Sequence, residues 1–206
     1  MIIEVSGIDG SGKTTLAQRI RRHVLESGIH AWERSLRSVT KLHLGDIAAV
    51  HGASHWSKAF DVDQVEFAHA MEMLGMCRQH FDPLDRTRHC FVTDTYVWRW
   101  LATAAMWQAT NLPSLAQLFA TLRAPEVSIR LEVSADLAYE RILARPQGDS
   151  LLKMRDRSRL DRYAAAFDQV AGLVPYKTLV IDANRPVDEV VDEALAHVDV
   201  ELARSV

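Results

Sequence analysis

The sequence has little cysteine and no long apolar run, and both shortages restrict what the protein can be. Its 206 residues include two cysteines, Cys77 and Cys90, whose spacing fits neither a metal site nor a disulfide framework. Such cysteine use is typical of a reducing compartment, so we predict a cytoplasmic location. No apolar run reaches the length of a membrane span, and the N-terminal residues have the pattern of a strand rather than of a signal peptide. The sequence therefore predicts no membrane partner.

An excess of positive charge is also missing. The formal net charge is −3, which argues against a generally basic nucleic-acid-binding protein. We find no internal repeat, low-complexity tract or interdomain linker, and the length fits one domain. Because 48% of the residues are hydrophobic, a complete core is possible. We therefore predict a single domain over residues 1–206 whose partner is a small molecule.

Apolar segments of strand length alternate with segments of helical period along the chain. The predicted strands are Met1–Ser6, Ile29–Arg34, Cys90–Asp94, Val127–Val133 and Thr178–Asp182. The predicted helices are Lys13–Ser27, Asp61–Phe81, Val97–Arg123 with a break near Pro113, Ala135–Ala144 after a Ser134 cap, Leu160–Leu173, and a last helix that opens at Pro186. Residues 38–57 have no clear pattern.

This alternation predicts an α/β fold with a five-stranded parallel sheet flanked by helices. Such sheets bind their ligands at the carboxyl ends of the strands. Gly7, Asp94 and Asp182 all lie at predicted strand ends. We therefore expect them along one edge of the sheet.

One loop carries a specific chemical signal. Residues 7–14 read GIDGSGKT and fit the pattern G-x-x-x-x-G-K-[ST] between a predicted strand and a predicted helix. Glycines let consecutive N–H groups turn inward toward phosphate oxygens, and the following helix presents its positive end. Lys13 adds a full charge near the β- and γ-phosphates, and the Thr14 hydroxyl can bind Mg²⁺. A plain glycine turn is the alternative. The predicted nucleotide-binding residues of this P-loop are Gly7, Asp9, Gly10, Ser11, Gly12, Lys13, Thr14 and Thr15.

The rest of the chain favours a kinase among nucleotide-binding proteins. It lacks the Asn-Lys-x-Asp motif that reads guanine in GTPases, and it is short for a motor or transporter ATPase. A kinase that uses ATP needs an acidic residue near Mg²⁺ and mobile positive charge over the transferring phosphoryl group. Asp94 ends an apolar strand, where its carboxylate can bind Mg²⁺ directly or through water. A helix cap is the alternative role for Asp94.

Positive charge gathers after the fourth predicted strand. Seven cations occur between residues 141 and 162, namely Arg141, Arg145, Lys153, Arg155, Arg157, Arg159 and Arg162. A solvated helix face is the common explanation of such a run. At this position, however, a lid would cross the phosphates. We predict an arginine-rich lid over residues 145–159, with at least one of Arg145, Lys153 and Arg155 on the transferring phosphate.

These residues together resemble the thymidylate kinase family of nucleoside monophosphate kinases. The segment GIDGSGKTT resembles the phosphate loop of that family, and PLDRTRHCFVTDTY is similar to its segment leading to Asp-Arg-Tyr. AYERILAR resembles the helix that enters its lid, and VIDANRPVDEV resembles its closing strand and helix. The likeness covers nearly the whole chain, although the first segment is the most specific.

The resemblance implies roles for the residues that match. Asp9 would bind a sugar hydroxyl of the acceptor, and Asp94 would lie beside the metal. Arg141 would stack on the adenine of ATP, with Ala183 at the border of that ring, and Arg145 would begin the lid. The implied catalytic set is Lys13, Asp94, Arg145 and Asp9, and the implied metal residues are Thr14 and Asp94. The family also implies Mg²⁺ as a cofactor and a homodimer.

The departures from the family gather in the acceptor pocket. Its Asp-Arg-Tyr reads Asp94-Thr95-Tyr96 here, so the Arg that would grip the acceptor phosphate is missing. RWLATA replaces the stretch with the base-reading Gln, and ERSLRS, residues 33–38, replaces Arg-Glu-Pro-Gly. Met73 occupies the counted position of the thymine-reading Arg, and Arg78 fits that role only if the helix is shortened or shifted. ERS also resembles a motif of deoxynucleoside kinases, a match that we interpret as coincidence.

Two main interpretations of the acceptor remain open. In the first, the acceptor is a nucleoside monophosphate other than standard dTMP, and Arg99, Arg34 or Arg37 replaces the lost Arg. In the second, it is a non-nucleotide metabolite with a hydroxyl, carboxyl or phosphonate group. A nucleotide-binding regulator without phosphotransfer is a third alternative. Trp98 and Trp100 do not share a helix face, so one of them is expected to point toward the pocket. The predicted acceptor-binding residues are Asp9, Arg37, Arg78, Tyr96, Trp98 and Arg99.

Overall fold

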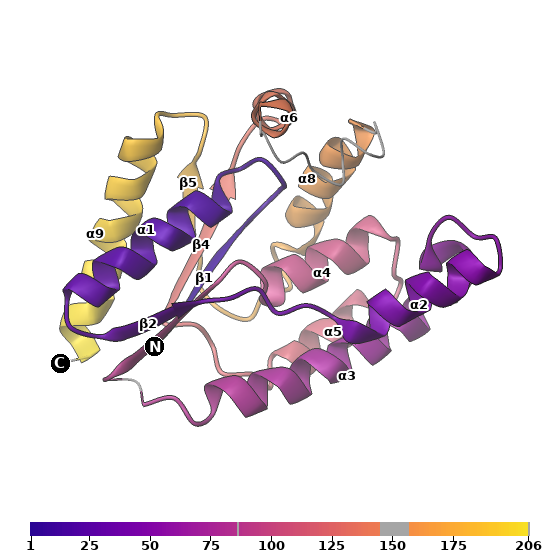
Figure 1. Cartoon of the computed structure of the whole chain (residues 1–206), viewed down its shortest axis with the longest axis horizontal. Coiled ribbons are helices and arrows are strands. Elements are labelled where there is room, and N and C mark those ends of the chain that lie inside the picture. Colours follow the sequence, from indigo (N-terminus) through magenta and orange to yellow (C-terminus); the bar gives the residue numbers. More distant parts are fainter. Residues whose placement is uncertain (86, 145–156, 206) are drawn as a thin grey trace.

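A computed structural model describes residues 1–85, 87–144 and 157–205 of the chain. Its strands are β1 (Ile2–Gly7), β2 (His30–Glu33), β3 (His89–Thr93), β4 (Val127–Glu132) and β5 (Leu179–Asp182). All four pairings between them are parallel, and the order across the sheet is β2-β3-β1-β4-β5 (Figure 1). The predicted five-stranded parallel sheet is therefore confirmed, and Gly7, Asp94 and Asp182 do lie at or just after strand ends on one edge.

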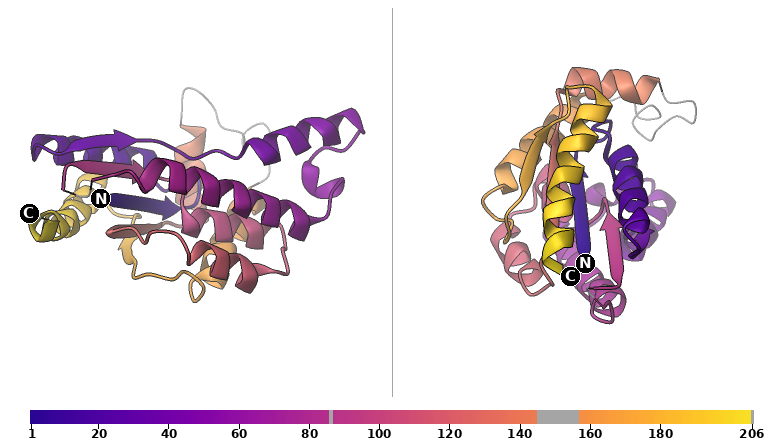
Figure 2. Two further views of the ribbon diagram at one scale, coloured as in Figure 1. Left: turned by 90° about the horizontal axis from the view of Figure 1, so that it is seen from below. Right: turned by 90° about the vertical axis from the view of Figure 1, so that its left-hand side faces the viewer.

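Helices cover both faces of the sheet (Figures 1 and 2). One face packs against α1 (Lys13–Glu26) and α9 (Val187–Ser205) through residues such as Leu16, Ile20 and Val191. The other packs against α3 (Val62–Phe81), α4 (Val97–Met106), α5 (Leu112–Phe119) and α8 (Ser158–Val170). The helix α6 (Ala135–Leu143) begins at Ser134, whose side chain accepts a hydrogen bond from the Leu137 N–H as predicted. In the part of the chain that the structure describes, no helix has the length and apolarity that a membrane crossing requires.

The segment without a clear sequence pattern forms α2 (Val39–Val50) and the short 3₁₀ helix η1 (Trp56–Lys58). Ser38 caps α2 locally by accepting a hydrogen bond from the Lys41 N–H. The carboxylate of Glu72 on α3 accepts further hydrogen bonds from the Ser38 hydroxyl at 2.6 Å, the Val39 N–H at 2.7 Å and the Thr40 N–H at 3.3 Å. A carboxylate stabilises a helix N-terminus by satisfying its free N–H groups and opposing its dipole. Because this carboxylate lies 33 residues away, the local sequence gave no sign of it.

The predicted break near Pro113 falls slightly earlier. The helix α4 ends at Met106, and Gln108 adopts a left-handed conformation with φ 64°. Pro113 lies in the first turn of α5. A proline is tolerated there because the N–H that it lacks would have no partner within the helix.

A buried carboxylate at the centre of the sheet fixes α4 in place. Glu4 on β1 is 0% exposed. Its Oε1 accepts a hydrogen bond from the Trp98 N–H at 3.0 Å, and its Oε2 accepts one from the Tyr176 hydroxyl at 2.6 Å and one from Ser128 at 3.2 Å. Burial disfavours the charged form and raises the pKa of Glu4 to about 7, although these hydrogen bonds oppose the shift.

The pKa of Glu4 predicts a pH-dependent stability. The ordinary value is 4.5, so between 4.5 and about 7 the folded protein keeps a proton that the unfolded chain has lost. The stabilisation from this proton is complete below pH 4.5 and is lost as pH rises to about 7. We expect the free energy of urea unfolding of wild type to fall, relative to that of Glu4→Gln, by up to about 1.4 kcal/mol for each pH unit within this window. A difference between the two proteins that does not change with pH would contradict this assignment.

Candidate functional site

The phosphate loop lies between β1 and α1, and its backbone requires glycine. Gly10 and Gly12 have φ angles of 86° and 96°, which side chains disfavour. A Cβ on Gly10 would lie 2.3 Å from the backbone oxygen of Ala138 on α6. A Cβ on Gly7 would lie 2.6 Å from the backbone oxygen of Leu131 on β4. The loop is therefore packed tightly against its neighbours and has no room for side chains at these points.

Lys13 and Ser11 fit a bound phosphate. The Lys13 side chain, on a residue that is 6% exposed, donates a hydrogen bond from Nζ to the Ile8 carbonyl at 2.7 Å and lies 3.8 Å from Oδ1 of Asp9. The Ser11 hydroxyl is buried and has no hydrogen-bond partner within the described residues. A buried orphan hydroxyl is costly unless a ligand satisfies it. The loop therefore has the donor set that a phosphate group needs.

One pocket, of about 260 Å³, opens on the α9 side of this loop. Its lining includes Gly10, Ser11, Gly12 and Thr15 from the loop and α1, Arg141 from α6, and Ala183 after β5. The side chains of Val187, Val190 and Val191 supply an apolar wall. The structure thus brings six of the ten predicted nucleotide-binding residues to one pocket, from the loop, α1, α6 and the end of β5. Lys13 and Thr14 lie at the start of α1 beside them.

A second pocket, of about 450 Å³, opens beside Asp9. Asp94 lies on its wall, where it accepts a hydrogen bond from the Ser35 hydroxyl at 2.5 Å. Four cations also line it, namely Arg37, Lys41, Arg99 and Arg159. Lys41 is paired with the buried carboxylate of Glu66, so three arginines and the carboxylates of Asp9 and Asp94 set the charge of the pocket, which suits an anionic ligand. Since Asp9 belongs to the phosphate loop, the two pockets meet at that loop.

Three of the predicted acceptor-binding residues do not line this pocket. Tyr96 is fully buried, and its hydroxyl donates a hydrogen bond to the Arg123 carbonyl at 2.7 Å. Trp98 turns its indole to the other side of α4, where it donates to Thr178 at 2.8 Å and stacks on Phe167. Arg78 borders a smaller hollow with Tyr96, because α3 keeps its predicted length and is not shifted.

Some predicted residues lie outside the described part of the chain. Arg145, Lys153 and Arg155 belong to residues 145–156, so their roles stay predictions, as does the lid over residues 145–159. Of the cations that follow, Arg157 pairs with Asp136, and Arg159 lines the second pocket.

The chain is similar to curated thymidylate kinases over almost its whole length. It is 25% identical to the thymidylate kinase of Dinoroseobacter shibae over 209 residues, which covers 97% of this chain and 96% of the relative. It is 24% identical over 201 residues to the thymidylate kinases of two Leptospira interrogans serovars, copenhageni and Lai, covering 95% of this chain and 92% of each relative. No protein-family model matches the chain.

The chain is thymidylate-kinase-like. This likeness confirms the resemblance read from the motifs, together with the prediction of an enzyme of the kinase class. The parallel sheet, with the phosphate loop between β1 and α1, agrees with it.

The pocket of this thymidylate-kinase-like chain contains residues that the sequence did not single out. They include Lys41 on α2 and His69 on α3. His69 lies one turn before Met73, the counted position of the base-reading residue, and Met73 itself is fully buried. Residues four apart lie on the same face of a helix, so the spacing between His69 and Met73 was the sequence signal available for His69. Trp100 rather than Trp98 turns toward the pocket, in agreement with the expectation that the two do not share a face.

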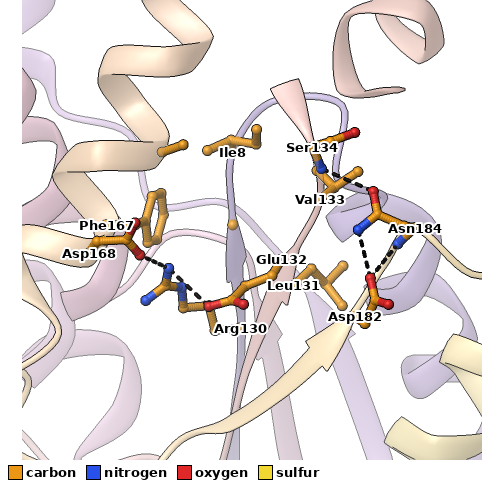
Figure 3. Close-up of a pocket in the computed structure, with 12 residues that line it drawn as sticks. Ile8, Arg130, Leu131, Glu132, Val133, Ser134, Phe167, Asp168, Asp182 and Asn184 are labelled. Carbon is orange, nitrogen blue, oxygen red and sulfur yellow. Dashed lines mark hydrogen bonds and ion pairs between the residues drawn. The ribbon is translucent and has the colours of Figure 1, made fainter. Parts of the chain in front are cut away.

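A further hollow, of about 470 Å³, lies on the α8 side of β4 and β5 (Figure 3). Arg130 crosses it between Asp168, at 2.5 Å, and Glu132, at 3.1 Å. Asp182 accepts hydrogen bonds from Asn184, whose side-chain oxygen accepts one from the Ser134 N–H. These polar groups satisfy one another, so we assign no ligand to this hollow.

The described residues contain no cluster of three or more His, Cys, Asp or Glu side chains able to hold a metal ion. A magnesium ion that arrives with a nucleotide needs fewer protein ligands, because phosphate oxygens and waters supply the rest. The Thr14 hydroxyl and the Asp94 carboxylate stay the predicted oxygen ligands of such an ion.

The glycine contacts predict the cost of adding a methyl group to the loop. Gly10→Ala must displace the α6 backbone, whereas Gly52→Ala, at φ 78° with no atom within 4 Å, only strains its own backbone. We expect Gly10→Ala to destabilise the protein by about 2 kcal/mol more than Gly52→Ala, because overpacking adds to the strain. Urea unfolding of both variants measures the difference. Equal losses would show that the loop and α6 are not closely packed.

Proposed function

We propose that the protein is an ATP-dependent phosphotransferase that moves the γ-phosphate of Mg-ATP to a nucleoside monophosphate other than standard dTMP. The observation that carries the proposal is the position of the phosphate loop between two pockets. Gly10, Ser11 and Gly12 line one pocket, and Asp9 lines the other. A donor and an acceptor bound in these pockets would meet at the loop. Catalysis by positioning and charge neutralisation requires this arrangement.

On the donor side, Lys13 and the loop N–H groups would hold the β- and γ-phosphates, and Arg141 and Ala183 would border the adenine. Bound Mg²⁺ would neutralise charge on the phosphate oxygens during transfer. Thr14 and Asp94 would hold the ion. Ser35 donates a hydrogen bond to Asp94, which holds the carboxylate in place on the pocket wall.

On the acceptor side, the cations support an anionic substrate. The family's phosphate-gripping Arg is replaced by Thr95, whose hydroxyl instead accepts a hydrogen bond from the Leu36 N–H. That bond fixes the segment carrying Ser35 and Arg37 beside Asp94. Arg99, which follows in the first turn of α4, and Arg37 would then grip the acceptor phosphate. Asp9 would bind a hydroxyl of the acceptor's sugar.

The reaction is tested by ADP release from Mg-ATP over a panel of nucleoside monophosphates, nucleosides, and hydroxylated or phosphonate metabolites. We expect turnover with at least one monophosphate other than dTMP. Lys13→Ala should reduce it by about a thousandfold or more because it removes the charge beside the transferring phosphate, with the unfolding midpoint unchanged.

Lys177→Ala, an exposed lysine away from both pockets, is the matched control and should keep full activity. Turnover that survives Lys13→Ala would contradict the role of the loop. No ADP release with any monophosphate, together with turnover of another metabolite, would favour the non-nucleotide alternative.

We also propose a homodimer, which the family likeness implies. Leu42, Ile47 and Val50 on α2 and Phe67 and Met71 on α3 are large apolar side chains exposed to solvent, and Val50 is 85% exposed. Large exposed apolar side chains on neighbouring helices are typical of interaction surfaces. Sedimentation equilibrium should give twice the chain mass of 23.2 kDa. Phe67→Glu should shift the measured mass toward that of one chain. A wild-type protein that sediments as one chain would disprove the dimer.

A further inference from the structure

Three ionisable side chains form a buried cluster on the wall of the acceptor pocket. Lys41 donates hydrogen bonds from Nζ to both carboxylate oxygens of Glu66, at 2.8 and 2.7 Å. Nδ1 of His69 lies 3.5 Å from Oε2 of the same carboxylate. Glu66 is 1% exposed and His69 is 5% exposed. Lys41 and His69 line the pocket, whereas Glu66 lies behind them.

The surroundings set the charge of each member. Burial disfavours the charged imidazolium and lowers the pKa of His69, despite the nearby carboxylate. Burial acts to raise the pKa of Glu66, but its contacts with His69 and Lys41 outweigh this effect and lower it. Burial also lowers the pKa of Lys41, although Glu66 opposes this effect. The cluster therefore contains a directly bonded Lys41–Glu66 pair and a histidine whose neutral form burial favours. Its net charge is zero, unlike the arginine side of the pocket.

The carboxylate also fixes the tautomer of His69. A neutral imidazole carries one proton, and the nitrogen that faces a carboxylate keeps it. Nδ1 is therefore the donor to Glu66, and Nε2 of the neutral ring is left as an acceptor. The His69 ring stands perpendicular to that of Trp100, with centroids 6.3 Å apart. Packing against Trp100 holds the ring in this orientation on the pocket wall.

We propose that Nε2 of His69 determines acceptor specificity by accepting a hydrogen bond from an amino group on the base of the monophosphate, while Lys41 donates to a neighbouring ring nitrogen. This inference rests on the proposed function, because it assumes that the second pocket holds the acceptor. His69 and Lys41 touch the acceptor, and Glu66 is a positioning residue.

The hydrogen-bond donors and acceptors on the pocket wall determine which class of base the acceptor can carry. An ammonium group has three N–H donors, and two of those on Lys41 go to Glu66. The wall thus offers one acceptor, on His69, beside one donor, on Lys41. An amino group next to an unprotonated ring nitrogen, as in cytosine or adenine, matches this pair. The thymine and uracil edge places one N–H between two carbonyl oxygens and would require two donors around one acceptor.

The test is isothermal titration, without ATP, of two pairs of compounds that differ only in the amino group. Adenosine monophosphate is compared with purine riboside monophosphate, and cytidine monophosphate with pyrimidin-2-one riboside monophosphate. In wild type, the amino member of at least one pair should bind about tenfold more tightly, the value of one hydrogen bond. His69→Leu should bring that ratio close to one. His69→Gln, which keeps an acceptor at the position of Nε2, should restore part of it.

His80→Leu is the matched control, since His80 lies on the same helix but does not line the pocket, and it should keep the wild-type ratio. No amino preference in wild type, no binding of any compound, or a preference that survives His69→Leu would each overturn the inference. ADP release on the same compounds separates the two proposals. A His69-dependent preference without phosphotransfer overturns the proposed function alone, whereas turnover without such a preference overturns this inference alone.

Discussion

The hydrogen bonds of the buried Glu4 carboxylate join the two halves of the site. β1 ends in the phosphate loop, and α4 carries Arg99 and Trp100 into the acceptor pocket. Glu4 on β1 accepts the Trp98 N–H in the first turn of α4, so the position of one half relative to the other depends on this contact. The same carboxylate accepts from Tyr176, just before β5. A carboxylate at the centre of a sheet is costly to bury, and here it is fully supplied with donors.

The phosphate loop is equally constrained from its other sides. Gly7 approaches the backbone of β4, and Gly10 approaches that of α6. The loop can therefore point its N–H groups at an anion without reorganising when the ligand arrives, which is the advantage of a preorganised electrostatic site. Because its two sides face different pockets, one rigid element would serve both substrates.

The second pocket is shaped by contacts between segments far apart in sequence. Thr95 stands where the family has an Arg, and its hydroxyl binds the backbone of the segment after β2. Glu72 holds the start of α2, which places Lys41 against Glu66. Each replacement thus has a structural partner, and together they produce a pocket with an arginine side and a neutral polar wall.

The amino-acid sequence alone determined the phosphate loop, the five strands and the capped start of α6, because contiguous residues with strong local preferences specify each of them. It also predicted the nucleotide-side residues, since parallel strands bring their carboxyl ends to one edge. Only the tertiary structure decided that α2 exists, that Trp100 and not Trp98 faces the pocket, and that His69 lines it. A carboxylate 33 residues away adds to the local Ser38 cap at the start of α2, and the direction of a side chain in a buried helix depends on what packs around it. Neither the distant carboxylate nor the packing around a helix can be predicted from a local pattern of residues.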